Sequence, residues 1–269
     1  MIAQSRTSRR ECFSMIVRSL SDHFICIKQH EHASISLQLL NQLTIKKRDF
    51  LQNIDSLKLA VRSHDCGWIR LDQSPKWNDE TNAPYTFMDF PLRDKLQAYK
   101  GGIDQVVVKD AYAGLLCSHH YVQFSQTSDN QLAINFVKAE RERQHDIINK
   151  MAHFNADNFN AHYDLLAFLD HLSLFICLYA KEKTANNQTP FIQAGVPMPQ
   201  SFFLNEKKLA YDWLSENDLT IKNISFKRNF SIHWREKKLL HKDVEMNGLE
   251  QTYKHTPYTD ARVHITYAR

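Results

Sequence analysis

The sequence predicts a mainly α-helical bundle with a small antiparallel β appendage formed by N- and C-terminal segments. Apolar residues recur at helical spacing through most of residues 29–181. Short alternating or β-branched runs that are typical of strands occur at residues 15–27 and after Leu209. With 269 residues, the chain is long enough to bury a substantial core.

The first elements are expected to be a hairpin and two helices. The apolar runs 15–17 and 24–27 flank a polar turn, which predicts the hairpin. Residues 29–43 and 49–65 then follow helical spacing. Gly67 comes directly after the second helix and is expected to cap it.

The middle of the chain is expected to hold one long loop and four more helices. Three prolines and several Asp and Asn residues predict irregular structure for residues 72–91, and loops of this length often act as lids or binding loops. The first of the four helices is expected to end at Gly101-Gly102. The four helices are predicted at residues 92–100, 110–124, 131–154 and 163–181.

The C-terminal part is expected to form a small sheet packed on the helical body. The segments 219–224, 226–234 and 261–267 show short alternations that are typical of antiparallel strands. These changes of character divide the chain into three parts, with Met15 as an alternative start. The parts are a polar peripheral leader at 1–14, a helical domain at 15–200 and a β-rich extension at 201–269.

Composition narrows the classes of function. The 6 glycines form no dinucleotide-binding or P-loop motif, which argues against nucleotide binding through a glycine-rich loop. The net charge of +4 is too small to predict a nucleic-acid partner, although it would help to attract a phosphorylated substrate. The 5 cysteines form no C-x-x-C pair, which indicates reduced thiols in a cytoplasmic protein. No signal peptide or membrane span is expected, because Asp170 and His171 interrupt the most apolar stretch.

Four polar residues interrupt the apolar faces of the predicted helices: His32, His64, Asp65 and Asp170. His is the commonest metal ligand, and a metal site in a helical protein needs ligands that point inward from several helices. The helical neighbours of Asp170 are largely apolar. An unpaired buried carboxylate costs several kcal/mol, so Asp170 requires a partner such as a cation. The four residues together predict a metal site.

Each of these residues alone has a simpler explanation. A single histidine on an apolar face is more often a hydrogen-bonded core residue, and the dipeptide His64-Asp65 could be only the end of a helix. Asp170 could cap a helix or pair with an arginine. The metal interpretation therefore depends on the order and the helical placement of all four residues.

The same residues resemble a known family. The order His32, then His64-Asp65 followed by Gly67, then a distant Asp170 resembles the HD-domain superfamily of metal-dependent phosphohydrolases. Longer segments resemble an uncharacterised bacterial branch of it, a domain of unknown function, over residues 15–179 and more weakly through the tail. These segments are Met15-Ile16-Val17-Arg18, Gln29-His30-Glu31-His32-Ala33, His64-Asp65-Cys66-Gly67-Trp68 and Asp170-His171-Leu172-Ser173-Leu174.

The resemblance implies an all-helical, HD-domain-like core that binds a divalent metal ion. The implied ligands are His32, His64, Asp65 and Asp170. Many members of the superfamily hydrolyse nucleotides or other phosphate esters, and some bind two metal ions through further histidines between the HD pair and the last Asp.

His119, His120 and His145 fall in that interval. His120 is the preferred additional metal ligand or phosphate contact, because it shares a helical face with apolar residues. His119 is the alternative. His145 lies in a charged segment and is expected to be solvated.

The chain departs from the better-known HD enzymes at Trp68, where a lysine often follows the HD-x-G element. This difference puts a standard nucleotidase assignment in doubt, and Trp68 is expected to support the site or to form a wall of its pocket. Lys100 and Lys109 are candidate phosphate contacts, although a solvated lysine is the simpler interpretation of each.

The expected function is metal-dependent hydrolysis of a phosphate ester of a small molecule or nucleotide. Asp65 would orient a metal-bound water, and His120 would donate to a phosphate oxygen or to the leaving group. The cofactor would be one or two divalent ions, with Mn, Fe, Zn, Mg and Ni as candidates. Two alternatives stay open, a di-iron oxygenase-like HD protein and a non-catalytic binding module that a metal stabilises. The substrate and the oligomeric state stay open.

Overall fold

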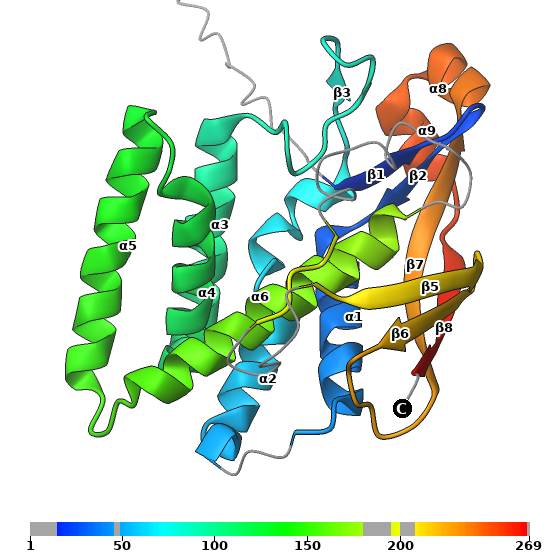
Figure 1. The fold of residues 1–269 in the computed structure, drawn as a ribbon. Coiled ribbons are helices and arrows are strands. Elements are labelled where there is room, and N and C mark those ends of the chain that lie inside the picture. Colours follow the sequence, from blue (N-terminus) through cyan, green and yellow to red (C-terminus); the bar gives the residue numbers. More distant parts are fainter. Residues whose placement is uncertain (1–14, 46–48, 180–194, 200–207, 268–269) are drawn as a thin grey trace, which may run out of the picture.

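The computed structural model describes residues 15–45, 49–179, 195–199 and 208–267. Within these residues, a body of packed helices lies beside a six-stranded mixed β-sheet (Figure 1). The prediction of a mainly α-helical bundle with a small antiparallel appendage was therefore wrong. Strands from both ends of the described chain join in one sheet, so the protein has a substantial α/β fold.

The sheet is built around one long strand. Its order is β1 (Ile16–Ser19), β2 (His23–Ile27), β7 (Phe230–Leu240), β8 (Thr259–Tyr267), β6 (Asp218–Lys222) and β5 (Ala210–Ser215). The expected N-terminal hairpin is confirmed, because β1 and β2 pair antiparallel. On its other edge, β2 pairs antiparallel with β7, with Phe24 opposite Leu239. β6 and β8 pair parallel.

The apolar patterns of the strands follow from what covers each face of the sheet. In β2, Ile25 and Ile27 pack into the main core, whereas Phe24 and Cys26 pack into a second cluster beneath two short C-terminal helices. These helices are α8 (His241–Asn247) and α9 (Leu249–His255). A strand that is covered on both faces is a continuous apolar run, since successive side chains point to opposite faces. The first half of β7 is covered on one face, and its buried and exposed residues alternate.

The helical body covers one face of the sheet. It comprises α1 (Gln29–Gln42), α2 (Ile54–Ser63), α3 (Leu92–Lys109), α4 (Ala111–Ser125), α5 (Gln131–Lys150) and α6 (Ala156–Leu178). α1 packs on β7, and the end of α6 packs on β1. α3, α4 and α5 lie on the side away from the sheet (Figure 1). The predicted helices at 29–43, 110–124 and 131–154 are confirmed within a few residues.

α6 is the central helix of the molecule. It is long and apolar enough to cross a membrane by composition, but 78% of its most apolar window is buried inside the protein. It begins at Ala156, several residues before the predicted start at 163, because the Asn155 side chain accepts a hydrogen bond from the Asn158 backbone N–H and caps the helix. The helix that resembles a membrane span is therefore the core helix.

Glycine at the end of the HD segment has a different role from the one expected. Gly67 lies inside a short 3₁₀ helix, η2 (Cys66–Trp68), and does not have the left-handed conformation of a helix cap. A Cβ atom on Gly67 would overlap the carbonyl oxygen of Ala98, and one on Gly102 would lie 2.8 Å from the Gly67 nitrogen. The helix α3 does not end at Gly101-Gly102 but continues to Lys109. Gly102 lies inside it, where the absence of a side chain lets the backbone of η2 approach closely.

Several short elements were not predicted. β5, α8 and α9 lie in the C-terminal part. The expected loop at 72–91 contains a small hairpin of β3 (Trp77–Asn78) and β4 (Ala83–Pro84). Two 3₁₀ helices were also not predicted. η1 (Asp49–Leu51) precedes α2, and η3 (Leu71–Gln73) lies at the start of this loop. The expected leader at 1–14 lies outside the described residues.

Candidate metal centre

The four predicted metal ligands meet in the core, where α1, α2, η2 and α6 pack together. His32 lies on α1, His64 caps the end of α2, Asp65 directly precedes η2, and Asp170 lies on α6. Their exposed fractions are 0%, 1%, 8% and 3% respectively. The apolar stripes that these residues interrupt are thus the faces that pack together.

Ligand atoms of His32, His64 and Asp170 are close enough to share one ion, and Asp65 adjoins them. His32 Nε2 lies 2.6 Å from Asp65 Oδ2, and His64 Nε2 lies 3.3 Å from Asp170 Oδ1. His64 Nε2 is also 4.0 Å from Asp65 Oδ2. Ligand atoms of His32, His64 and Asp170 all lie within 4.8 Å of one another. Two imidazoles and two carboxylates form a donor set that suits a divalent transition metal.

The rings of His32 and His64 are both oriented by a contact of their Nδ1 atoms. His64 Nδ1 donates to the carbonyl oxygen of Val61 at 2.8 Å, which directs Nε2 toward the carboxylates. His32 Nδ1 lies 3.0 Å from Ser173 Oγ. Metal-binding histidines commonly donate their second ring N–H in this way. His64 Nε2 is buried without a hydrogen-bond partner, so this atom is suited to a metal ligand.

The charges of the cluster depend on one another. Burial lowers the pKa of His64, but Asp65 and Asp170 outweigh it and raise this pKa to about 9. Burial raises the pKa of Asp65 and of Asp170, but the neighbouring histidines, His64 foremost, hold both below their usual range. The carboxylates thus remain ionised only beside positive charge, which a bound cation would supply.

Of the additional histidines, His120 reaches the cluster and His119 does not. His120 Nε2 on α4 lies 3.6 Å from Asp170 Oδ2, and its Nδ1 is buried without a hydrogen-bond partner. Burial lowers the pKa of His120 to about 4, although Asp170 opposes this shift, so its ring is neutral near pH 7. The His119 ring instead packs on Tyr163, with 4.4 Å between ring centroids.

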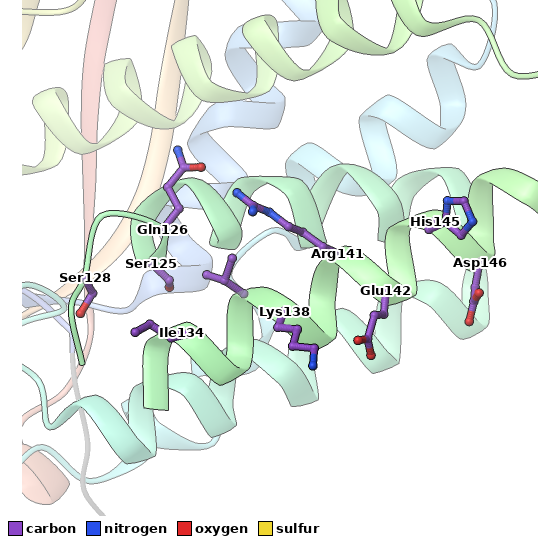
Figure 2. Close-up of a pocket in the computed structure, with 10 residues that line it drawn as sticks. Ser125, Gln126, Ser128, Ile134, Lys138, Arg141, Glu142, His145 and Asp146 are labelled. Atoms are coloured by element: carbon purple, nitrogen blue, oxygen red, sulfur yellow. The ribbon is translucent and has the colours of Figure 1, made fainter. Parts of the chain in front are cut away.

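A groove of about 600 Å³ runs along α5 and the end of α4, and it contains the exposed His145 (Figure 2). Its other charged lining residues carry both signs: Lys138, Arg141, Glu142 and Asp146. None of the four predicted metal ligands lines it. The groove is therefore separate from the candidate metal centre.

A second cavity, of about 330 Å³, opens onto the cluster itself. Asp65, His120 and Asp170 line one part of it. The other lining residues are Gln29, Trp68, Phe87, Met88, Lys95, Tyr99, Tyr121, Phe124, His171 and Leu174. Trp68 therefore forms part of the cavity wall, and His120 can contact a molecule bound in the cavity.

The lysine at this cavity is Lys95, which the sequence did not single out. Lys100 lies outside the lining and pairs with Asp104 at 2.8 Å, and Lys109 is exposed and also outside it. Tyr121 was also missed. Its hydroxyl contacts the His64 carbonyl oxygen and lies 2.9 Å from Asp65 Oδ1. The adjacent His120 was the only sequence signal for it.

The fold and the site together define an α/β protein with a buried His-Asp cluster that fits a divalent cation. The chain belongs to a family described as a protein of unknown function (DUF3891), whose model matches residues 15–241. The matched region runs from β1 to the end of β7 and contains all four predicted ligands. No curated protein and no solved structure matches the chain.

Proposed function

We propose that this protein is a metal-dependent hydrolase of the HD type that cleaves a phosphate ester of a small molecule or nucleotide. The observation that carries the proposal is the buried cluster of His32, His64, Asp65 and Asp170 beside a 330 Å³ cavity. The His64 Nε2 atom is buried without a hydrogen-bond partner and faces the carboxylates, which supports metal binding by this cluster. A divalent ion held there would lower the pKa of a bound water and neutralise charge on the phosphoryl group.

The protein groups around the cavity supply the remaining chemistry. Asp65 has one oxygen near the Tyr121 hydroxyl and the other near His32, so its carboxylate is held in place to orient a metal-bound water. His120 is neutral and has an unpartnered nitrogen, so it can donate a hydrogen bond to a phosphate oxygen or to the oxygen of the leaving group.

The oxidative alternative, a di-iron HD protein, requires ligands for a second ion. Of His119, His120 and His145, only His120 lies at the cluster, which favours the hydrolytic proposal. We place the protein in the cytoplasm. Cys26, Cys66, Cys117 and Cys177 are free thiols, which supports this location.

The proposal is tested by metal analysis together with a panel of phosphate esters. We expect purified protein to contain near-stoichiometric metal and to hydrolyse at least one ester. His64→Ala and Asp170→Asn should lose both metal and hydrolysis, because each removes a buried ligand. His145→Ala is the matched control, since His145 is exposed on α5, and it should retain both.

Three results would contradict the proposal. A folded His64→Ala or Asp170→Asn protein with unchanged metal content would exclude the metal site. Full metal occupancy without turnover, combined with lower thermal stability of His64→Ala, would indicate a non-catalytic binding module. About two iron ions per chain, without hydrolysis of any ester, would favour the oxidative alternative.

A further inference from the structure

The cavity beside the metal centre has two chemically different parts. Asp65, His120 and Asp170 contribute polar groups from the metal centre, whereas aromatic and aliphatic side chains form most of the remaining lining. Ligand sites in proteins typically combine an apolar lining with a few converging polar groups. The polar and the apolar lining residues would contact different groups of a substrate, and these groups indicate its chemical class.

Gln29 is the least expected polar residue of this cavity. It is 1% exposed, and its Nε2 atom is buried without a hydrogen-bond partner. Its backbone N–H donates to the buried Asp72 carboxylate at 2.7 Å, which fixes the first residue of α1. Gln29 precedes His32 by one helical turn, so both side chains lie on the face of α1 that meets the site.

A second unpartnered nitrogen, His120 Nδ1, lies at the same cavity. Buried polar groups are normally hydrogen-bonded, and leaving one without a partner is costly. Two buried nitrogens without partners at one cavity therefore indicate a ligand that carries oxygen acceptors. A phosphoryl group beside the metal centre has this chemistry.

The lining of the cavity also includes large apolar side chains that are exposed. Phe124 and Met88 are 53% and 51% exposed, and both line the cavity together with Phe87 and Leu174. Large apolar residues exposed around a concave site indicate contact with an apolar partner or ligand. Burial on a ligand would account for their exposure.

One lysine lies at this cavity among the residues that the structure describes, and no arginine does. Lys95 is partly buried, and its Nζ lies 3.5 Å from the carbonyl oxygen of Met88. One lysine suits a single phosphoryl group better than a di- or triphosphate. Lys95 also lies on the same helix as Lys100, which is outside the cavity and provides a matched control.

We propose that this cavity is the substrate site and that it binds a phosphate monoester rather than a nucleotide. The alcohol part of this ester is apolar and about the size of a phenyl ring. Gln29 and Lys95 bind the phosphoryl oxygens, and Phe124 and Met88 contact the organic group. The inference rests on the proposed function, because it assigns the substrate class of that hydrolase.

Binding of non-hydrolysable phosphonates to the metal-loaded protein tests the inference without turnover. Isothermal titration calorimetry would compare phenylphosphonate with methylphosphonate, which share the phosphoryl group and differ in apolar area. We expect phenylphosphonate to bind at least about tenfold more tightly, since a single methylene in an apolar pocket already contributes a factor of this order. Phe124→Ala should reduce this ratio. Leu214→Ala, which removes an exposed apolar side chain of β5 outside the cavity, should not.

The phosphoryl contacts are tested on the same two ligands. Gln29→Leu should weaken both phosphonates by about tenfold, because each loses a hydrogen bond to a charged group, and should leave their ratio unchanged. Gln29→Glu has the size of the native residue and should weaken both further by repulsion. Lys95→Met should weaken both several-fold, and Lys100→Met should bind as the wild type does. Thermal unfolding of each variant checks that it is folded.

The results separate this inference from the proposed hydrolysis. If the phosphonates bind with the expected pattern but no ester is cleaved, hydrolysis is excluded and the cavity assignment stands. If esters are cleaved but phenyl- and methylphosphonate bind equally well, the substrate class is wrong and hydrolysis stands. Wild-type affinity in folded Gln29→Leu and Phe124→Ala would also overturn the inference.

Discussion

Two histidines of the candidate metal centre are held by groups that would not touch the metal. The ring of His64 is fixed by a backbone carbonyl, which no side-chain substitution removes. The ring of His32 depends on Ser173, whose hydroxyl also lies 2.9 Å from the Asp170 carbonyl oxygen. Because the hydroxyl hydrogen can go to that carbonyl, Ser173 Oγ can accept from His32 Nδ1. Ser173 thus orients His32 and lies one helical turn after Asp170.

We expect Ser173→Ala to lower metal affinity by about tenfold, since it frees the His32 ring while leaving all four ligands in place. The free energy of unfolding should fall by about 1 kcal/mol through the lost hydrogen bonds. Chelator competition measures the affinity, and urea unfolding measures the stability.

Ser118→Ala is the matched control for this prediction. Ser118 is equally buried, and its hydroxyl bonds Glu140 at 2.8 Å, away from the four ligands. It should lose stability without losing metal affinity. Unchanged affinity in folded Ser173→Ala would show that His32 does not need this orientation.

Among the elements, the contact between η2 and α3 decides where Asp65 lies. Gly67 and Gly102 bring the two backbones together, and Asp65 is only two residues before Gly67. Trp68, at the end of η2, packs edge-to-face on Phe90 and Tyr99 with centroid distances of 5.4 and 5.6 Å. The position of η2 is therefore set by a close backbone contact on one side and by an aromatic cluster on the other.

Gly67→Ala should destabilise the protein by about 1–3 kcal/mol or more, because its Cβ atom would overlap the backbone of α3. It should also weaken metal binding, since η2 can relieve the overlap only by moving Asp65. Urea unfolding and metal titration measure the two effects.

Gly101→Ala, one residue away from the contact on α3, provides the control. Its Cβ atom would meet nothing within 4 Å, so the substitution should stabilise the helix by up to about 1 kcal/mol. Equal effects of Gly67→Ala and Gly101→Ala would contradict the proposed close contact.

For the whole molecule, the sheet connects the two ends of the chain. β2 pairs with β7 over five residue pairs, and β8 lies between β7 and β6. Ile25 and Ile27 of β2 share the main core with Ile232 and Trp234 of β7. The N-terminal hairpin and the C-terminal strands therefore depend on each other for both hydrogen bonds and burial.

A fragment of residues 15–200 should not fold alone, because β2 would present an unpaired apolar edge in place of β7. We expect it to be insoluble or to lack a cooperative unfolding transition. Co-expression with residues 201–269 should restore soluble, metal-binding protein. Cooperative unfolding of the isolated 15–200 fragment would contradict this interdependence.

Local patterns predicted most of the long helices and the N-terminal hairpin, and failed for the shortest elements and for the pairing of strands that are distant in the sequence. The helical periodicity of α1, α4 and α5 spans at least 14 residues, so the apolar stripe is visible in the sequence. α8 and α9 have 7 residues each, too few for a clear stripe. The pairing of β2 with β7 joins segments about two hundred residues apart, and no local pattern encodes such a partner.

The sequence alone identified the four residues that meet in the core, because a polar residue in an apolar stripe is evident from its neighbours. His32, His64, Asp65 and Asp170 were all recognised in this way. Gln29, Lys95 and Phe124 carry no such signal, since they become cavity residues only when α1, α3 and α4 pack around one space. Periodicity within an element is a local property of the chain, whereas the sheet and the shape of the cavity arise from contacts between distant elements, which only the tertiary structure shows.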